Sequence, residues 1–294
     1  MILPNFMCIG AAKSGTTTLF EILKQHPNVY VPLFKEPRFF DVNESYNKGI
    51  DWYSDTYYSN VKNEYTIGDF TPSYFFNKDT PQRIYQHLNS NIKFIVILRN
   101  PVDRAYSHYL HTLRDEREKL TFKDAIKKEQ SRMIKYEQKM DYVNILRHSY
   151  ISQGMYGKLL QRYLEYYKLE DFLILHFEED FLLNRKKTIK RVFEFLEIPN
   201  NDNININILA NKASKARFKT IKKLMQKKGM WRNSLKNIIP HQIIQIVKNN
   251  IQKYNTVEYN PPKLKAEYRK FLMEEHFNSD ILILESIIKR KMNW

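Results

Sequence analysis

The residues most suited to chemistry form the segment 10–18, which reads GAAKSGTTT. Backbone N–H groups in a glycine-rich turn, followed by the N-terminus of a helix, create a favourable site for an anion. Lys13 adds a positive charge to this segment. Further donors come from Ser14, Gly15, Thr16, Thr17 and Thr18. The sequence therefore predicts a loop that binds phosphate.

The two glycines have the spacing of a Walker A loop, but the lysine of that motif is displaced. Thr16 stands at the lysine position, and the chain's own lysine is Lys13. A nucleotide kinase also needs an acidic side chain near the end of a neighbouring strand to hold Mg²⁺. Here the apolar run KFIVIL, 93–98, leads into Arg99 instead. Both departures argue against a P-loop kinase acting on ATP, which stays open as an alternative.

Arg99 offers a second contact for an anion, because a guanidinium can grip a phosphate with two parallel hydrogen bonds. Ser107 lies eight residues further on, in a predicted helix, where its hydroxyl can donate to the same group. The start of this helix has a local cause, since Asn100 can cap it and Pro101 suits its first position. We expect a second phosphate contact here that needs no metal.

The elements that must position these motifs alternate between strand and helix. Apolar runs predict strands at 5–10, 28–32, 64–69, 93–98 and 172–177. Helical periodicity predicts helices at 16–25, 81–88, 101–113, 122–140, 155–167, 188–196, 263–275 and 280–289. This alternation is typical of a mainly parallel sheet with helices on both faces. We predict an α/β fold with a P-loop-like central parallel sheet flanked by helices, in a single domain of residues 1–294.

The net charge of +16 is concentrated late in the chain. The stretch 203–257 holds twelve Lys or Arg residues and no Asp or Glu. Such a stretch predicts a surface that faces an anion, with a solvated basic face as the alternative. A nucleic-acid partner is disfavoured, because the stretch lacks a recognition motif and has few aromatic residues between its charges.

The start of the chain bears on the cellular location of the protein, and its single cysteine bears on disulfide bonds. The segment MILPNFMCIG lacks a basic region and a cleavage pattern, and no run of about 18 apolar residues occurs. Cys8 is the only cysteine, which excludes an intrachain disulfide and a cysteine-based zinc site. We expect a cytoplasmic protein with no membrane anchor in this chain, although a trimmed anchor would leave the same sequence.

The two phosphate motifs resemble those of a known family. CIGAAKSGTTTLFEIL resembles the 5′-phosphosulfate loop, and ILRNPVDRAYSHY the 3′-phosphate motif, of sulfotransferases that use 3′-phosphoadenosine 5′-phosphosulfate (PAPS). KEPRFFD (35–41), GIDWY (49–53) and TPSYF (71–75) are most similar to the heparan sulfate (glycosaminoglycan) branch and its bacterial relatives. The resemblance runs in order to about residue 199, and HFEEDF and the end before Trp294 are also similar.

The resemblance implies an enzyme that moves a sulfuryl group from PAPS to a hydroxyl or amine by in-line displacement. Its acceptor would be a carbohydrate or glycoconjugate, which can be acidic, and its product adenosine 3′,5′-bisphosphate, with no metal required. A non-catalytic module that binds polyanions is a further alternative. Of the phosphate-binding residues, Lys13 would contact the transferred group, 14–18 the 5′-phosphate, and Arg99 with Ser107 the 3′-phosphate.

Glu36 matches the glutamate that serves this branch as catalytic base. Other sulfotransferases use a histidine, and His108 is beside Ser107, but neighbouring side chains on a helix point in different directions. The resemblance therefore favours Glu36 as the base and Lys13 as the group that neutralises the leaving phosphate. An exposed loop carboxylate paired with Lys35 or Arg38 is the structural alternative for Glu36.

Two departures from the family pattern concern positive charges. The glycosaminoglycan enzymes usually have a lysine before Thr-Pro, where this chain has Phe70, preceded by Asp69, so the acceptor chemistry can differ. The late Lys-Gly loop that closes over the cofactor in that branch is not obvious either. Candidates for its lysine, each of which can also be a surface charge, are Lys215, Arg217 and Lys253.

Overall fold

The structure is a computed structural model that describes residues 1–88, 91–208, 214–216, 256–258 and 262–294. Its contacts divide the chain into two compact units. One consists of Met1–Ala210 with Leu264–Trp294, and the other of Asn211–Lys263. The single domain of residues 1–294 expected from the sequence stays a prediction.

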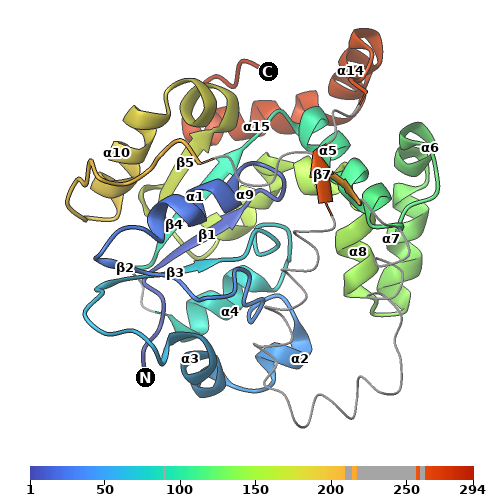
Figure 1. The fold of residues 1–294 in the computed structure, drawn as a ribbon. Coiled ribbons are helices and arrows are strands. Elements are labelled where there is room, and N and C mark those ends of the chain that lie inside the picture. Colours follow the sequence, from blue (N-terminus) through green and yellow to red (C-terminus); the bar gives the residue numbers. More distant parts are fainter. Residues whose placement is uncertain (89–90, 209–213, 217–255, 259–261) are drawn as a thin grey trace. The chain divides into compact units, whose positions relative to one another are not determined.

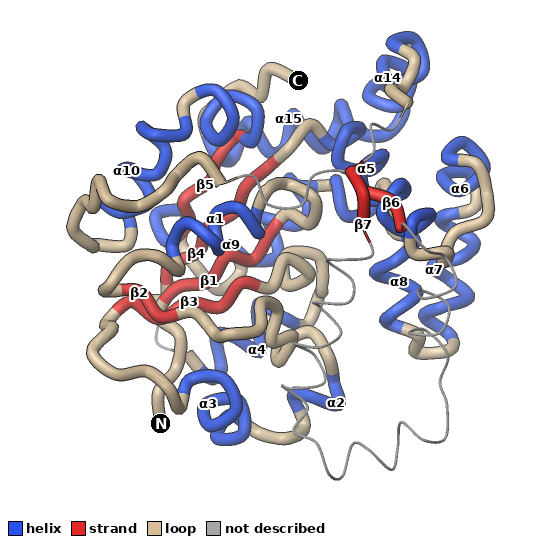
Figure 2. Tube along the Cα trace, viewed as in Figure 1, coloured by secondary structure: helices blue, strands red, loops and turns tan. Residues whose placement is uncertain are grey.

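A parallel sheet forms the centre of the larger unit (Figures 1 and 2). Its strands are β1 (Phe6–Gly10), β2 (Val29–Tyr30), β3 (Thr66–Phe70), β4 (Lys93–Leu98) and β5 (Phe172–His176). They lie in the order β2-β3-β1-β4-β5, and all four pairings are parallel. Both phosphate motifs follow the adjacent inner strands β1 and β4. The predicted P-loop-like parallel sheet is therefore confirmed.

Helices connect the strands and complete the larger unit. They are α1 (Thr16–Leu23), α2 (Asn43–Tyr46), α3 (Ile50–Tyr58), α4 (Thr80–His87), α5 (Pro101–Arg114), α6 (Phe122–Lys127), α7 (Glu129–Gln138), α8 (Tyr142–His148), α9 (Tyr156–Leu164), α10 (Arg185–Phe195), α14 (Ala266–Leu272) and α15 (Asn278–Ile288). Short 3-10 turns occupy Ser152–Gly154 and Leu169–Asp171, and π-helical turns occupy Phe177–Leu183 and Met273–Phe277. The short helices α2, α3 and α8 were not predicted, because four to nine residues carry little periodicity.

The predicted helix 122–140 is wrong as one element, because the chain breaks at Lys128 into α6 and α7. Glu129, the first residue of α7, is buried, and its carboxylate accepts hydrogen bonds from the backbone N–H groups of Ile151 and Ser152 at 2.8 Å. This long-range contact draws the chain inward at the point where helical periodicity alone predicts continuation. The predicted strand 28–32 also shortens, to the two residues of β2.

The two faces of the sheet are covered by different helices. Phe6 and Cys8 of β1 belong to an apolar cluster with α1 and α10. Met7 and Ile9 face the opposite side, where the cluster includes residues of α3, α4, α9 and α15. This alternation follows from the two-residue period of a strand. Both faces are apolar, as expected for a central parallel sheet, so function is left to the ends of the strands.

The smaller unit contains one described pair of strands. β6 (Ser214–Ala216) and β7 (Thr256–Glu258) are antiparallel, with Lys215 opposite Val257. Arg217 and Lys253 lie outside the described residues, so the basic residue that would close over a cofactor stays a prediction. Among the helices that the structure describes, none is long and apolar enough to cross a membrane.

Candidate active site

The phosphate loop follows β1 and continues into the first turn of α1, whose N-cap is Gly15. Gly15 has φ 89°, in the left-handed region, and a Cβ atom there would lie 2.8 Å from Phe177 Cε2. Both features call for glycine. Just before it, Ser14 is fully buried, and its Oγ has no hydrogen-bond partner within the described parts of the chain. A buried hydroxyl without a partner is unfavourable, so the loop gains from a ligand that supplies an acceptor.

Lys13 places a cation in the same loop. Its backbone is left-handed, with φ 72°, and its carbonyl oxygen accepts a hydrogen bond from Arg99 Nη1 at 3.2 Å. Burial lowers the pKa of Lys13 to about 8; the charges of Arg114 and Arg99 lower it further, and those of Asp115 and Glu36 oppose the shift. Lys13 is therefore a partly desolvated cation, which an approaching anion would stabilise.

Arg99 lies at the end of β4, next to the phosphate loop. Its guanidinium is 5.2 Å from the ring centroid of Phe177, the residue that packs against Gly15, and Nε is buried without a partner in the described part of the chain. The Tyr156 hydroxyl donates to the Arg99 carbonyl at 2.9 Å. Phe177 thus connects the two phosphate motifs. The sequence analysis assigned no role to Phe177, although this residue belongs to the motif HFEEDF.

Ser107 and His108 lie in α5, and the start of this helix is as predicted. The Asn100 side chain accepts hydrogen bonds from the N–H groups of Val102 and Asp103, at 3.1 and 3.2 Å, which confirms the cap. Ser107 is half-buried, two turns into the helix. His108 is buried, and burial, followed by the charge of Arg104, lowers its pKa well below the ordinary value.

Glu36 belongs to the loop 35–41, which a lysine attaches to the phosphate loop. Lys35 Nζ donates to Thr16 Oγ1 at 3.3 Å and lies 3.1 Å from Glu36 Oε1. The Glu36 side chain is 45% exposed, and its backbone has a φ of 69°. The pairing with Lys35 that was the alternative interpretation is therefore present, and it brings the carboxylate to the phosphate loop. Glu36 is accessible to a substrate, whereas His108 is enclosed.

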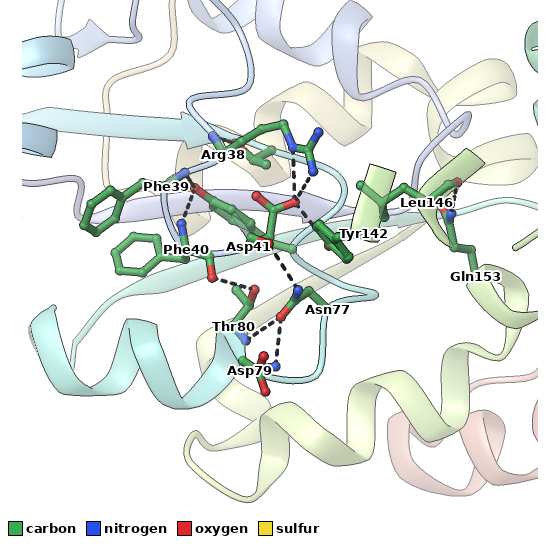
Figure 3. A network of polar contacts seen from close by, with 12 residues as sticks. Arg38, Phe39, Phe40, Asp41, Asn77, Asp79, Thr80, Tyr142, Leu146 and Gln153 are labelled. Carbon is green, nitrogen blue, oxygen red and sulfur yellow. Dashed lines mark hydrogen bonds and ion pairs between the residues drawn. The ribbon is translucent and has the colours of Figure 1, made fainter. Parts of the chain in front are cut away.

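The end of this loop is anchored by a buried carboxylate, Asp41 (Figure 3). Arg38 donates to Asp41 Oδ2 through Nε and Nη2, at 3.2 and 3.0 Å, and the Tyr142 hydroxyl donates to the same oxygen at 3.2 Å. Asn77 Nδ2 donates to the backbone carbonyl of Asp41 at 3.3 Å. Residues from α8 and from the segment after β3 therefore hold the loop.

Phe70, which replaces the lysine usual in the glycosaminoglycan enzymes, lies in the core. Its ring packs edge-on against Phe6 and Phe20, with centroids 5.8 and 5.3 Å apart, and 1% of the residue is exposed. A charged side chain in these surroundings would be strongly unfavourable. The preceding residue, Asp69, points to the other face of the sheet, toward Tyr53 and Tyr74.

The phosphate loop, the cation of Lys13 and the carboxylate of Glu36 therefore meet at the C-terminal ends of β1 and β4. A hydrogen bond joins Arg99 to Lys13, and Lys35 links Thr16 to Glu36. The roles assigned to these residues and to Ser107 stay predictions. Across the described residues, no group of three or more His, Cys, Asp or Glu side chains is arranged to hold a metal ion.

Comparison with known proteins gives consistent results. A family model described as a sulfotransferase domain matches residues 3–257. Heparan sulfate glucosamine 3-O-sulfotransferase 5 of Homo sapiens is 33% identical over 199 residues, which are 67% of this chain and 54% of that protein. Heparan sulfate glucosamine 3-O-sulfotransferase 3B1 of Mus musculus is 33% identical over 194 residues, 66% of this chain and 46% of that protein. This chain thus spans about half the length of these curated relatives.

A solved structure is similar over nearly the full chain. The crystal structure of a sulfotransferase from Alicyclobacillus acidocaldarius matches with a TM-score of 0.68 and 25% sequence identity, over 99% of this chain and 98% of that one. The likeness in fold therefore extends beyond the part that the curated relatives cover.

Proposed function

This chain belongs to the sulfotransferase family, and from that premise we propose that it transfers a sulfuryl group from PAPS to a carbohydrate acceptor. Membership confirms the resemblance drawn from the two phosphate motifs. The names of the relatives support a glucosamine-containing glycan of the heparan sulfate kind as the acceptor class. Because the chain spans about half of those relatives, their activity and their acceptor form part of the proposal.

The observation that carries the proposal is a pair of unpartnered donors beside the partly desolvated cation Lys13. Ser14 Oγ and Arg99 Nε are buried without partners in the described parts of the chain, and the carbonyl of Lys13 in the first motif accepts a hydrogen bond from Arg99 in the second. This donor set fits a ligand with two separate phosphate groups: the loop would hold the 5′-phosphate, and Arg99 the 3′-phosphate. No carboxylate for Mg²⁺ follows β4, because Arg99 and Asn100 come next.

The chemistry assigns a separate task to each of two residues. The acceptor oxygen or nitrogen forms a bond to sulfur while the bond from sulfur to the phosphate oxygen of PAPS breaks. Glu36 takes the proton of the acceptor, which typically contributes 10²–10⁴-fold in rate. Lys13 neutralises the charge that grows on the departing phosphate oxygen, in a site from which water is partly excluded. Adenosine 3′,5′-bisphosphate leaves with both electrons of the broken bond.

The test measures thermal stabilisation by adenosine 3′,5′-bisphosphate and by ADP, each with and without Mg²⁺. We expect the bisphosphate to raise the melting temperature without metal, because ligand that binds only the folded state stabilises it. Arg99→Ala should abolish this shift. Arg162→Ala is the matched control, since Arg162 likewise donates through Nη1 to a carbonyl at 3.2 Å, but from α9. Equal stabilisation by ADP, or a shift that requires Mg²⁺, would overturn the assignment and favour a kinase.

A further inference from the structure

We propose that Asp69 is a positioning residue for Glu36: through the Tyr74 hydroxyl, its carboxylate fixes the loop 35–41 that carries the base. The proposal rests on the proposed function, because it concerns the base of that reaction. Asp69 itself lies in the interior and does not touch the substrate. Its influence passes through hydrogen bonds to the backbone of the loop.

Asp69, at the end of β3, is fully buried and surrounded by hydroxyl donors. Its Oδ2 accepts from Tyr53 at 2.6 Å and from Tyr74 at 3.1 Å, and its Oδ1 accepts from Thr71 at 2.6 Å. Burial raises the pKa of Asp69 to about 6, against the lowering effect of these three hydrogen bonds. Burial of a carboxylate is costly unless it is hydrogen-bonded, and these three donors compensate the cost while they hold the carboxylate in one orientation.

The Tyr74 hydroxyl links Asp69 to the backbone of the loop 35–41. It accepts hydrogen bonds from the backbone N–H groups of Phe39 and Phe40, at 3.0 and 3.3 Å. A tyrosine hydroxyl has one proton, so donating it to Asp69 leaves the oxygen free to accept from both N–H groups. Thr71 makes a weaker contact of the same kind, since its Oγ1 lies 3.5 Å from the N–H of Arg38.

The loop needs such support because its backbone is strained. Glu36 and Arg38 have φ angles of 69° and 56°, in the left-handed region that non-glycine residues rarely adopt. Strained residues of this kind persist only where the surroundings hold them in place. Lys35 holds the loop on one side of Glu36, and the hydrogen bonds to Tyr74 hold it on the other. Glu36 is therefore fixed between two anchors.

Two tyrosines provide a matched pair that separates this relay from general stability. Tyr53 and Tyr74 are both fully buried, and both donate to the same oxygen of Asp69. Tyr74 alone of the two accepts from the loop backbone, whereas the Tyr53 hydroxyl contacts Tyr58 at 2.8 Å. Replacing either by phenylalanine removes one buried hydroxyl and keeps the ring. Both variants should lose thermal stability, and Tyr74→Phe should lose more, because it also leaves the N–H groups of Phe39 and Phe40 without their acceptor. Only Tyr74→Phe should affect the loop.

The experiment compares Tyr74→Phe with Tyr53→Phe in amide hydrogen exchange and in steady-state kinetics with PAPS and heparan sulfate. Tyr74→Phe should speed exchange at the Phe39 and Phe40 amides and lower kcat by roughly 10- to 100-fold, because small misplacements of a catalytic group are costly. The KM for PAPS should change by less than about 3-fold, since Glu36 acts on the acceptor. Tyr53→Phe should keep both amides protected and stay within about 3-fold of wild-type kcat.

Equal losses of kcat in the two variants, or unchanged exchange at Phe39 and Phe40 in Tyr74→Phe, would overturn the proposal. Should Tyr74→Phe fail to fold, Asp69→Asn replaces it against Tyr53→Phe with the same readouts. The proposed function fails separately, by absence of bisphosphate binding and of transfer in the wild type. In that event the exchange measurement still shows whether Tyr74 holds the loop, and only the link to Glu36 is refuted.

Discussion

The phosphate loop and the loop 35–41 meet at one site but use their polar groups differently. In and around the phosphate loop, Ser14 Oγ and Arg99 Nε are buried and have no partner in the described parts of the chain. In the loop 35–41, the N–H groups of Phe39 and Phe40 are already paired with Tyr74. In the phosphate loop, the unpartnered donors are available to a ligand, whereas in the loop 35–41 the paired N–H groups hold the backbone in place.

The two loops also differ in what gives them their shape. The phosphate loop has its own conformational cause, with Gly15 at the left-handed position and α1 directly after it, and Arg99 and Phe177 contact it from other elements. The loop 35–41 is held by side chains 33 to 101 residues away in the sequence, in the segment after β3 and in α8. We expect changes in the first loop to act on cofactor binding, and changes in the second to act on turnover.

Among single substitutions, we expect Glu36→Gln to have the largest effect on turnover. Loss of a general base should lower kcat by roughly 10²-fold or more, while the affinity for adenosine 3′,5′-bisphosphate stays unchanged. Turnover is measured with PAPS and heparan sulfate, and affinity by calorimetry. Glu44→Gln, an exposed carboxylate in α2, is the control. Wild-type turnover in Glu36→Gln would remove this residue as the base.

A change of pH should act on the phosphate loop through Lys13. Its pKa in the folded protein, about 8, lies below the ordinary value of 10.5, so the free protein loses this charge as the pH rises through about 8. Affinity for the bisphosphate should then fall by up to about tenfold per pH unit. By the same linkage, the unliganded protein should gain stability over the range from about 8 to 10.5, where only the unfolded state keeps the proton.

Lys13→Met is the control for this titration, since it should bind weakly and lack that pH dependence. Calorimetry of both proteins across the range provides the measurement. If affinity fell with pH equally in wild type and in Lys13→Met, another group would titrate, and Lys13 would not explain the pH dependence.

The smallest expected effect is that of Ser14→Ala. A single hydrogen bond to a charged group is worth about 1.5 kcal/mol, so affinity for the bisphosphate should fall by roughly tenfold, with kcat nearly unchanged. Ser73→Ala is a matched control, because Ser73 Oγ is also buried without a partner in the described residues but lies outside the phosphate loop. Unchanged affinity in Ser14→Ala would mean that the free hydroxyl does not mark the ligand.

Much of the structure around the two phosphate motifs could be predicted from the sequence, because it depends on residues that are close together in the chain. Alternating apolar runs gave the strands β1 and β4, and Asn100 with Pro101 gave the start of α5. The break at Lys128 was missed, because its cause is a contact between Glu129 and residues 151–152. The assigned roles, the single domain and the cytoplasmic location stay predictions.

The family and the positions of both phosphate motifs could be recognised from the sequence alone, since glycines, caps and strand periodicity act within a few residues. Three features became visible in the folded chain: Phe177 joins Gly15 to Arg99, Phe70 lies in the core, and Asp69 reaches the loop of Glu36 through Tyr74. They could not be predicted, because these side chains meet across a folded sheet. Spacing in the chain predicts neighbours within an element, but partners between elements depend on how the elements pack.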